Sequence, residues 1–162
     1  MVGWSRPPSQ ALTALLSFSL LRSAGALTAE EKEQLDIHNV YRCMHGVPVF
    51  TWSAKVAANA QKWADNGLWA HSDNSARTLD GVLHGENLAW GSPRMTAAAS
   101  VIAWYGEISL TSPYGLVSAF SSGIGHYTQV VWSTSLTLGC AKGALKDSVR
   151  SATLKISGRG CT

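Results

Sequence analysis

Charged residues are scarce in this chain, and the common signatures of hydrolytic sites are missing. Asp, Glu, Lys and Arg make up 14% of the 162 residues, with no cluster of Lys and Arg that could neutralise a run of phosphates. There is no HExxH motif and no GxSxG motif, so the zinc-protease helix and the nucleophile elbow are both absent. These absences exclude nucleic acid as a predicted partner and disfavour two large classes of hydrolase.

The chain also lacks an apolar run long enough to span a bilayer. Residues 11–21 are mainly apolar but too few for a membrane-spanning helix. Arg6 precedes this run, and Ala24-Gly25-Ala26 follows it with the spacing that signal peptidase accepts. Residues 1–26 are therefore predicted to be a signal peptide and the protein to be secreted and extracellular, with a membrane anchor as the less favoured alternative. The remaining chain has 11 basic and 10 acidic residues, which indicates no electrostatic partner.

Cysteine is scarce as well. Cys43, Cys140 and Cys161 are an odd number, so at least one has no partner within the chain. A disulfide bond between Cys140 and Cys161 and a set of buried free thiols are both compatible with the sequence.

Two amphipathic helices are predicted near the start of the secreted part. Thr28 and Glu31 form a capping box for a helix that ends at Gly46, and its apolar residues follow helical spacing: Ile37, Val40, Tyr41 and Met44. Ser53 begins a second helix, ended by Gly67, with an apolar stripe of Val56, Ala57, Ala60, Trp63 and Ala64. Each helix needs a partner layer for its apolar face.

The rest of the chain alternates loops with short elements. Loops are predicted at 66–81 and 110–125, and a helix is predicted to begin at Ser92-Pro93 and to run to Ile108. Residues 126–132 suit either a strand or a helical turn, and strands are predicted at 137–142 and 152–157. Helices interleaved with a few strands predict an α+β layered domain.

Four ionisable residues stand beside apolar or aromatic neighbours, where an unpaired charge would be costly: His71, Glu86, Glu107 and His126. If the fold brings them together, they offer mutual hydrogen bonds and imidazole nitrogens suited to a divalent metal such as zinc. A purely structural role, in which the carboxylates hold loops together, is the alternative. The other histidines are weaker candidates: His38 is predicted to pack or hydrogen bond, and His45 and His84 to lie at the surface.

The same residues carry a family resemblance. His71-Ser72, HGENLAW (84–90), WYGEI (104–108) and GHYTQVVW (125–132) occur in an order and spacing that resemble the CAP superfamily of cysteine-rich secretory, antigen 5 and pathogenesis-related proteins. The resemblance implies an α-β-α sandwich with a small antiparallel sheet between helical layers, and a short helix at 126–132. It further implies a cavity lined by His71, Glu86, Glu107 and His126, with zinc bound in some members by the two histidines.

The C-terminal end departs from the family pattern from about residue 143. Leu154 and Ile156 fit an alternating strand, but the aromatic, Pro and Gly-Asn elements of the family are missing, and Cys161 comes late. The last strand is therefore predicted to be atypical or missing, within a CAP domain at 27–162.

The combined prediction is a secreted binding scaffold for a sterol or fatty acid, a divalent metal or a protein partner, and not a turnover enzyme. A zinc-dependent hydrolase that uses Glu86 or Glu107 as a base is one alternative, and a degenerate structural domain is another. Six tryptophans remain after residue 26, and they are predicted to fill the core in preference to lining a ligand groove.

Overall fold

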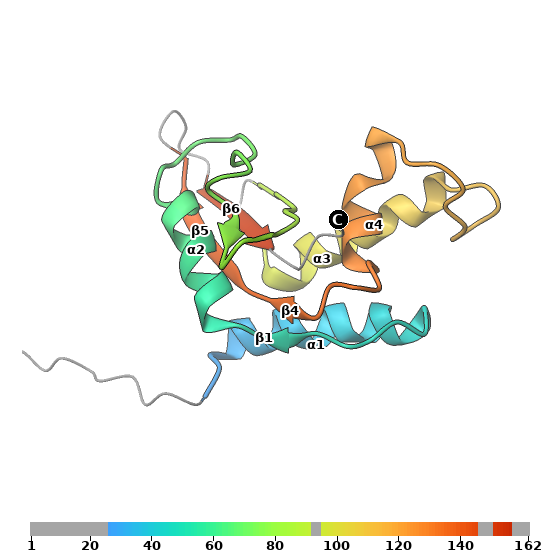
Figure 1. The fold of residues 1–162 in the computed structure, drawn as a ribbon, viewed down its shortest axis with the longest axis horizontal. Helices are drawn as coiled ribbons and strands as arrows, with labels where there is room; N and C mark the ends of the chain where they lie inside the picture. The colour runs from blue at the N-terminus through green and yellow to red at the C-terminus, as the bar shows by residue number, and fades with distance from the viewer. Residues whose placement is uncertain (1–25, 92–94, 146–150, 157–162) are drawn as a thin grey trace, which may run out of the picture.

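The computed structural model describes residues 26–91 and 95–145 in full and residues 151–156 by their backbone (Figure 1). Three parts of the sequence predictions lie outside these residues: the signal peptide apart from Ala26, the Ser92-Pro93 pair, and Cys161. Within the described part of the chain, no helix is both long and apolar enough to cross a membrane.

Both predicted N-terminal helices are confirmed, with their caps. Helix α1 (Ala29–Met44) begins with the Thr28–Glu31 capping box, and α2 (Ala54–Ala64) begins with Ser53, whose hydroxyl accepts a hydrogen bond from the Val56 amide at 3.3 Å. The buried residues of α2 are the apolar ones expected. For α1 the predicted apolar face is correct only in part: Ile37 and Tyr41 are partly buried and pack against the core. Val40 and Met44 are 58% and 67% exposed, whereas the buried residues are polar: Gln34, His38 and Arg42.

The third helix begins later than predicted. Helix α3 spans Ala97–Gly106, and its N-cap is Thr96, whose hydroxyl accepts a hydrogen bond from the Ala99 amide at 3.1 Å. Two short 3₁₀ helices, η1 (Glu107–Leu110) and η2 (Ser122–Ile124), border the predicted loop, and α4 (Gly125–Val130) follows. The GHYTQVVW stretch is therefore a short helix, as the family resemblance implied.

The strands are short and pair in twos among the described residues. Strand β1 (Thr51–Trp52) runs parallel to β4 (Thr137–Leu138), while β2 (Thr78–Leu79) and β3 (Val82–Leu83) form an antiparallel hairpin. Strand β5 (Cys140–Ala144) pairs antiparallel with β6 (Ser151–Ile156). A last strand is therefore present, so the possibility that it is missing is wrong.

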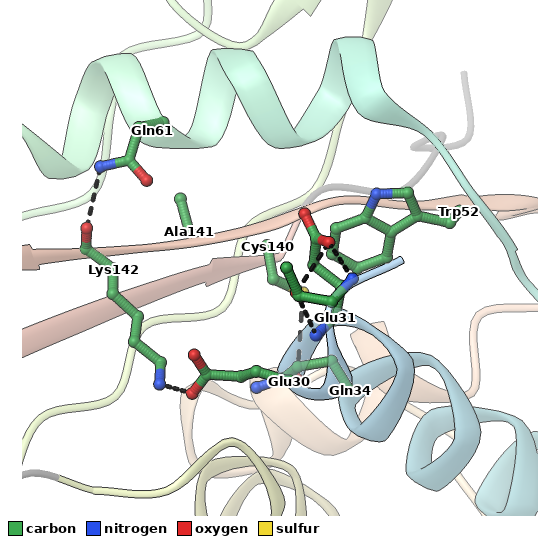
Figure 2. Close-up of a pocket in the computed structure, with 9 residues that line it drawn as sticks. Glu30, Glu31, Gln34, Trp52, Gln61, Cys140, Ala141 and Lys142 are labelled. Atoms are coloured by element: carbon green, nitrogen blue, oxygen red, sulfur yellow. Dashed lines mark hydrogen bonds and ion pairs between the residues drawn. The ribbon is translucent and has the colours of Figure 1, made fainter. Parts of the chain in front are cut away.

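The layered α+β sandwich is confirmed. Helix α2 packs against β5 and β6, while α1 packs against α3, and α3 against α4 (Figure 1). Figure 2 shows β5 between α2 and the start of α1: Cys140 and Lys142 point toward α1, and Ala141 toward α2. The largest apolar cluster of buried residues joins α3, α4 and the β1–β4 region, and consists of Phe50, Val101, Trp104, Val130 and Leu138.

Candidate functional site

The first His/Glu pair joins two loops. His71 follows α2 in the loop, and Glu86 follows β3; the His71 ring donates from Nδ1 to Glu86 Oε1 at 2.8 Å. Ser72 supplies two more donors to the same carboxylate, its amide at 2.8 Å and its hydroxyl at 2.7 Å. The Glu86 side chain is only 1% exposed. These hydrogen bonds compensate the loss of hydration of a buried carboxylate and fix the orientation of the exposed His71 ring.

The second pair lies at the start of α4. Glu107, directly after α3, accepts a hydrogen bond from His126 Nδ1 at 2.6 Å through one oxygen. Its other oxygen accepts from the backbone amides of His126 at 2.9 Å and Tyr127 at 3.1 Å. Glu107 therefore satisfies amides of the first turn of α4, for which no side-chain cap comes from Ile124. A structural role for Glu107 was among the alternatives predicted from the sequence, but the capping of α4 was not, because the cap comes from a residue distant in the sequence.

Both histidines face one cleft of about 420 Å³. Three of the four predicted cavity residues line it, namely His71, Glu86 and His126, whereas Glu107 lies against the His126 ring and is not part of the lining. The wall is completed by polar and aromatic residues: Asn87, Phe120, Ser122, Gly125, Thr128, Gln129 and Trp132. The cleft therefore combines two imidazoles with polar side chains and the aromatic rings of Phe120 and Trp132.

The loop after β3 is held against α4 by contacts that the sequence analysis did not identify. The side chain of Asn87, which is buried, donates to the His126 carbonyl at 3.0 Å. A Cβ atom at Gly85 would lie 1.9 Å from Oε1 of Gln129, so any larger residue here would displace the Gln129 side chain. The Gln129 Nε2 atom is buried without a hydrogen-bond partner among the described residues. These contacts could have been looked for from the HGEN motif at residues 84–87, which contains Gly85 and Asn87.

Each carboxylate determines which nitrogen of its histidine carries the proton. Because Nδ1 donates to Glu86 in one pair and to Glu107 in the other, the lone pair of each ring in its neutral form is on Nε2. A carboxylate behind a histidine is the usual outer shell of a zinc ligand. However, the described residues contain no group of three or more His, Cys, Asp or Glu arranged to hold a metal. The chemistry therefore fits an open site with two protein ligands and solvent.

The remaining histidines lie away from this cleft. His38 is fully buried and donates from Nδ1 to the Gln34 carbonyl at 2.7 Å; burial lowers its pKa to about 4. The surface prediction is wrong for His84 and correct in part for His45, which is the C-cap of α1 and is partly exposed. His84 is buried and its Nδ1 lies 2.9 Å from the Val82 carbonyl, while His45 Nε2 lies 3.0 Å from the Tyr105 hydroxyl in a half-buried aromatic contact.

The prediction that the tryptophans fill the core is correct for Trp104, which is buried and donates to the Leu88 carbonyl at 2.9 Å. It is wrong for Trp69, Trp90 and Trp132, which are exposed. Trp69 and Trp90 contact each other edge to face with centroids 6.3 Å apart, and Trp132 lines the cleft.

The sequence matches the family model described as "CAP: Cysteine-rich secretory protein family" over residues 35–149. Pathogenesis-related protein 1C of Nicotiana tabacum is 34% identical over 138 residues, covering 81% of this chain and 76% of the relative. From Candida albicans, Repressed by EFG1 protein 1 is 40% identical over 111 residues and Secreted protein RBT4 is 43% identical over 110. These matches cover 68% and 66% of this chain but span only 39% and 28% of the two Candida relatives.

Solved structures share the fold at low sequence identity. NaASP2, crystallised with Zn²⁺, superposes with a TM-score of 0.65 and 24% identity, covering 85% of this chain and 82% of its own. Venom allergen-like protein 4 of Schistosoma mansoni has a TM-score of 0.67 and 16% identity, with 84% and 92% covered.

Proposed function

The chain belongs to the cysteine-rich secretory protein (CAP) family, and from this we propose that it is an extracellular binding domain whose cleft takes a divalent metal on His71 and His126. The observation that carries the proposal is the pairing of each ring with a carboxylate through Nδ1, which leaves both Nε2 lone pairs available. Glu86 and Glu107 serve as positioning residues that orient the rings.

Zinc is the metal that this donor set favours. Imidazole nitrogen is a preferred zinc ligand, and the hydrogen bonds to Glu86 and Glu107 fix the orientation of the two rings. A bound zinc ion would supply Lewis acidity and a positive charge to the cleft. NaASP2, a structural neighbour, was crystallised with Zn²⁺. With two protein ligands, we expect affinity weaker than that of sites with three or four.

The cleft also offers an apolar wall for an organic ligand. Phe120 and Trp132 both line it and both are exposed, so either ring could cover the face of a sterol or fatty acid. We propose a ligand of this class, or a protein partner that inserts an apolar side chain, as the occupant of the wall. Extraction of radiolabelled cholesterol by the purified protein, compared with Trp132→Ala, would test this assignment.

The hydrogen bonds that Glu86 and Glu107 accept favour a binding role over hydrolysis. Glu86 accepts three hydrogen bonds, two from Ser72 and one from His71, and Glu107 accepts three at the start of α4. A general base must have an accessible lone pair directed at the attacking water. Because both carboxylates are committed to fixed donors, a zinc-dependent hydrolase is the less favoured reading.

Secretion is the location that the sequence and a relative support. The predicted signal peptide at 1–26 and the relative named as a secreted protein both support an extracellular location. N-terminal sequencing of protein recovered from the culture medium would test it, with a first residue of Leu27 expected.

Thermal unfolding with and without zinc is the direct test of the metal site. A ligand present at about 100 times its dissociation constant stabilises the folded state by about 2.7 kcal/mol, so the parent midpoint should rise clearly. His71→Ala and His126→Ala should keep a cooperative transition and lose the rise. A cooperative transition that zinc does not move would contradict the metal proposal, and the absence of a transition would favour the degenerate-domain alternative.

Glu107→Gln is a sharper variant, because it changes the proton position and keeps the shape. The glutamine amide oxygen can still accept from the α4 amides, while its nitrogen donates to His126 Nδ1 and drives the ring proton to Nε2. We expect a midpoint close to the parent's without zinc and a reduced rise with zinc. Ring ¹⁵N chemical shifts would report the tautomer, and an unchanged tautomer with an unchanged zinc response would contradict this role for Glu107.

A further inference from the structure

The chain between α3 and α4 exposes an unusual amount of apolar surface. Ile108 and Ile124, at its two ends, are buried, whereas the large apolar residues between them face outward: Leu110, Tyr114, Leu116, Val117 and Phe120. Tyr114 and Phe120 are each 72% exposed, the highest values for large apolar side chains in the described residues. We call residues 110–120 the apolar loop. It extends to one end of the molecule (Figure 1).

Hydrogen bonds hold the backbone of the apolar loop in place, although its side chains point outward. The Tyr127 hydroxyl donates to the Gly115 carbonyl at 3.0 Å, and the Gly115 amide donates to the Thr111 hydroxyl at 2.6 Å. The Leu116 amide closes a turn on the Pro113 carbonyl at 2.9 Å. The loop therefore presents its apolar side chains from a fixed base, and exposed clusters of this kind mark interaction sites.

Charge is absent from the same segment. No Asp, Glu, Lys or Arg occurs between Ile108 and Gly125. A partner recognised through charge would require complementary groups here, so the surface suits an electrically neutral one. Tyrosine beside aliphatic residues, with serines between them, is the composition of segments that lie at the boundary between lipid headgroups and acyl chains.

The small size of the apolar loop favours a bilayer over a protein as its partner. A stable protein interface takes about 800 Å² and 20–30 residues on each side, far more than five side chains on one loop supply. A bilayer sets no such minimum, because each apolar group that enters it contributes separately.

We propose that the apolar loop docks the protein on the surface of a bilayer of zwitterionic lipid, with Tyr114, Leu116 and Phe120 entering the headgroup boundary. The interaction does not require an occupant in the cleft. Because Phe120 belongs both to the loop and to the cleft lining, docking places the cleft mouth next to the lipid.

Co-sedimentation of the whole protein with phosphatidylcholine vesicles, with a chelator present to remove any contribution of metal, tests the proposal. The variant Tyr114→Ser with Leu116→Ser changes two exposed residues outside the cleft and should lower the partition coefficient at least about tenfold. Val40→Ser with Met44→Ser, which removes exposed apolar residues of α1, is the matched control and should bind like the parent. Both variants should keep the parent's thermal midpoint.

Salt and self-association distinguish the alternatives. Binding through an uncharged loop should be equal at about 0.1 M and 1 M salt, because only electrostatic attraction is screened over this range. The proposal is overturned if the parent does not bind, if both variants lose binding equally, or if binding requires phosphatidylserine and disappears at high salt. Sedimentation velocity showing a parent dimer that Tyr114→Ser with Leu116→Ser dissociates would also overturn it, in favour of a second copy of the chain.

Discussion

At the scale of single residues, the unusual feature is a buried polar row on α1. Gln34, His38 and Arg42 are four residues apart and almost completely buried. Arg42 donates to four backbone carbonyls, those of Pro48, Val130, Trp132 and Ser135, and its guanidinium lies 3.8 Å from the centroid of the Phe50 ring. Because Arg42 satisfies carbonyls at the end of α4, it connects α1 to the helix that carries His126.

His38 makes the stability of the fold dependent on pH. Burial lowers its pKa from 6.5 to about 4, and the proton of the charged form would have no acceptor at Nε2. The unfolded chain therefore binds this proton at a higher pH than the folded one. Stability contributed by neutral His38 is complete above pH 6.5 and is lost as the pH falls toward 4, by about 3 kcal/mol in total. Urea unfolding across this range measures the loss.

His38→Gln is the matched variant for this prediction, because glutamine does not titrate and can still donate to the Gln34 carbonyl. Its stability in this range should depend less on pH than that of the parent, even if its absolute stability is lower. An equal pH dependence in parent and variant would show that groups other than His38 cause the loss.

The same row explains why sequence periodicity identified only part of the buried face of α1, namely Ile37 and Tyr41. Ile37, Val40, Tyr41 and Met44 follow helical spacing, yet Val40 and Met44 are exposed. Hydropathy treats Gln34, His38 and Arg42 as surface residues, because it cannot include hydrogen-bond partners that lie more than sixty residues away, such as Ala97 and Val130. The caps at Thr28 and Ser53 were predictable since their partners are three residues away.

At the scale of elements, α2 and β5 approach closely because both contribute small residues. Ala60 and Ala64 of α2 pack on Ala141 of β5. On the same side of the strand, a Cβ atom at Gly139 would lie 2.2 Å from the Ala57 amide nitrogen, and one at Gly143 would lie 2.2 Å from the Ala64 carbonyl oxygen. These neighbours are backbone atoms, so they cannot move aside by changing rotamer.

Substituting either glycine by alanine should therefore force α2 away from the strand. We expect Gly139→Ala and Gly143→Ala each to lower the free energy of unfolding by about 3 kcal/mol, the upper part of the range for overpacking. Gly106→Ala is the matched control: it lies at the end of α3 with open space around the Cβ position, and it should be neutral or stabilising by up to about 1 kcal/mol. Urea unfolding of the three variants measures these differences. If all three had the same midpoint, the packing argument would be wrong.

The hairpin formed by β2 and β3 could have been predicted from a local sequence signal. Asp80 and Gly81, between the two strands, have φ angles of +52° and +74°, which is the backbone of a two-residue hairpin turn. Asp-Gly is a strong signal for this turn, but the segment was predicted only as a loop because its strands are two residues long. His71 and Glu86 flank this hairpin, whereas their mutual hydrogen bond depends on long-range packing that no local pattern contains.

At the scale of the whole molecule, β5 is the layer on which the helices assemble. Its Cys140 side chain points toward α1, where the thiol lies 3.9 Å from Oε1 of buried Gln34, and its Ala141 side chain packs on α2 (Figure 2). Burial raises the pKa of the Cys140 thiol well above its ordinary value, so little of the reactive thiolate forms. Cys43, by contrast, is exposed on α1. Opening of the layers should therefore control the reactivity of Cys140 and leave that of Cys43 unchanged.

Alkylation with iodoacetamide, followed by peptide mass spectrometry, measures this difference. In the native protein, Cys140 should react at least about a hundredfold more slowly than Cys43, because it requires an opening that separates α1 from β5. Gly143→Ala, which weakens the other side of β5 by about 3 kcal/mol, should accelerate Cys140 by about a hundredfold without affecting Cys43. Cys140 is partly exposed at a pocket that Thr28, Gln34 and Trp52 also line. Equal Cys140 rates in parent and variant would mean that the reagent enters through this pocket. Resistance of Cys140 even in denaturant would reveal a disulfide bond to Cys161.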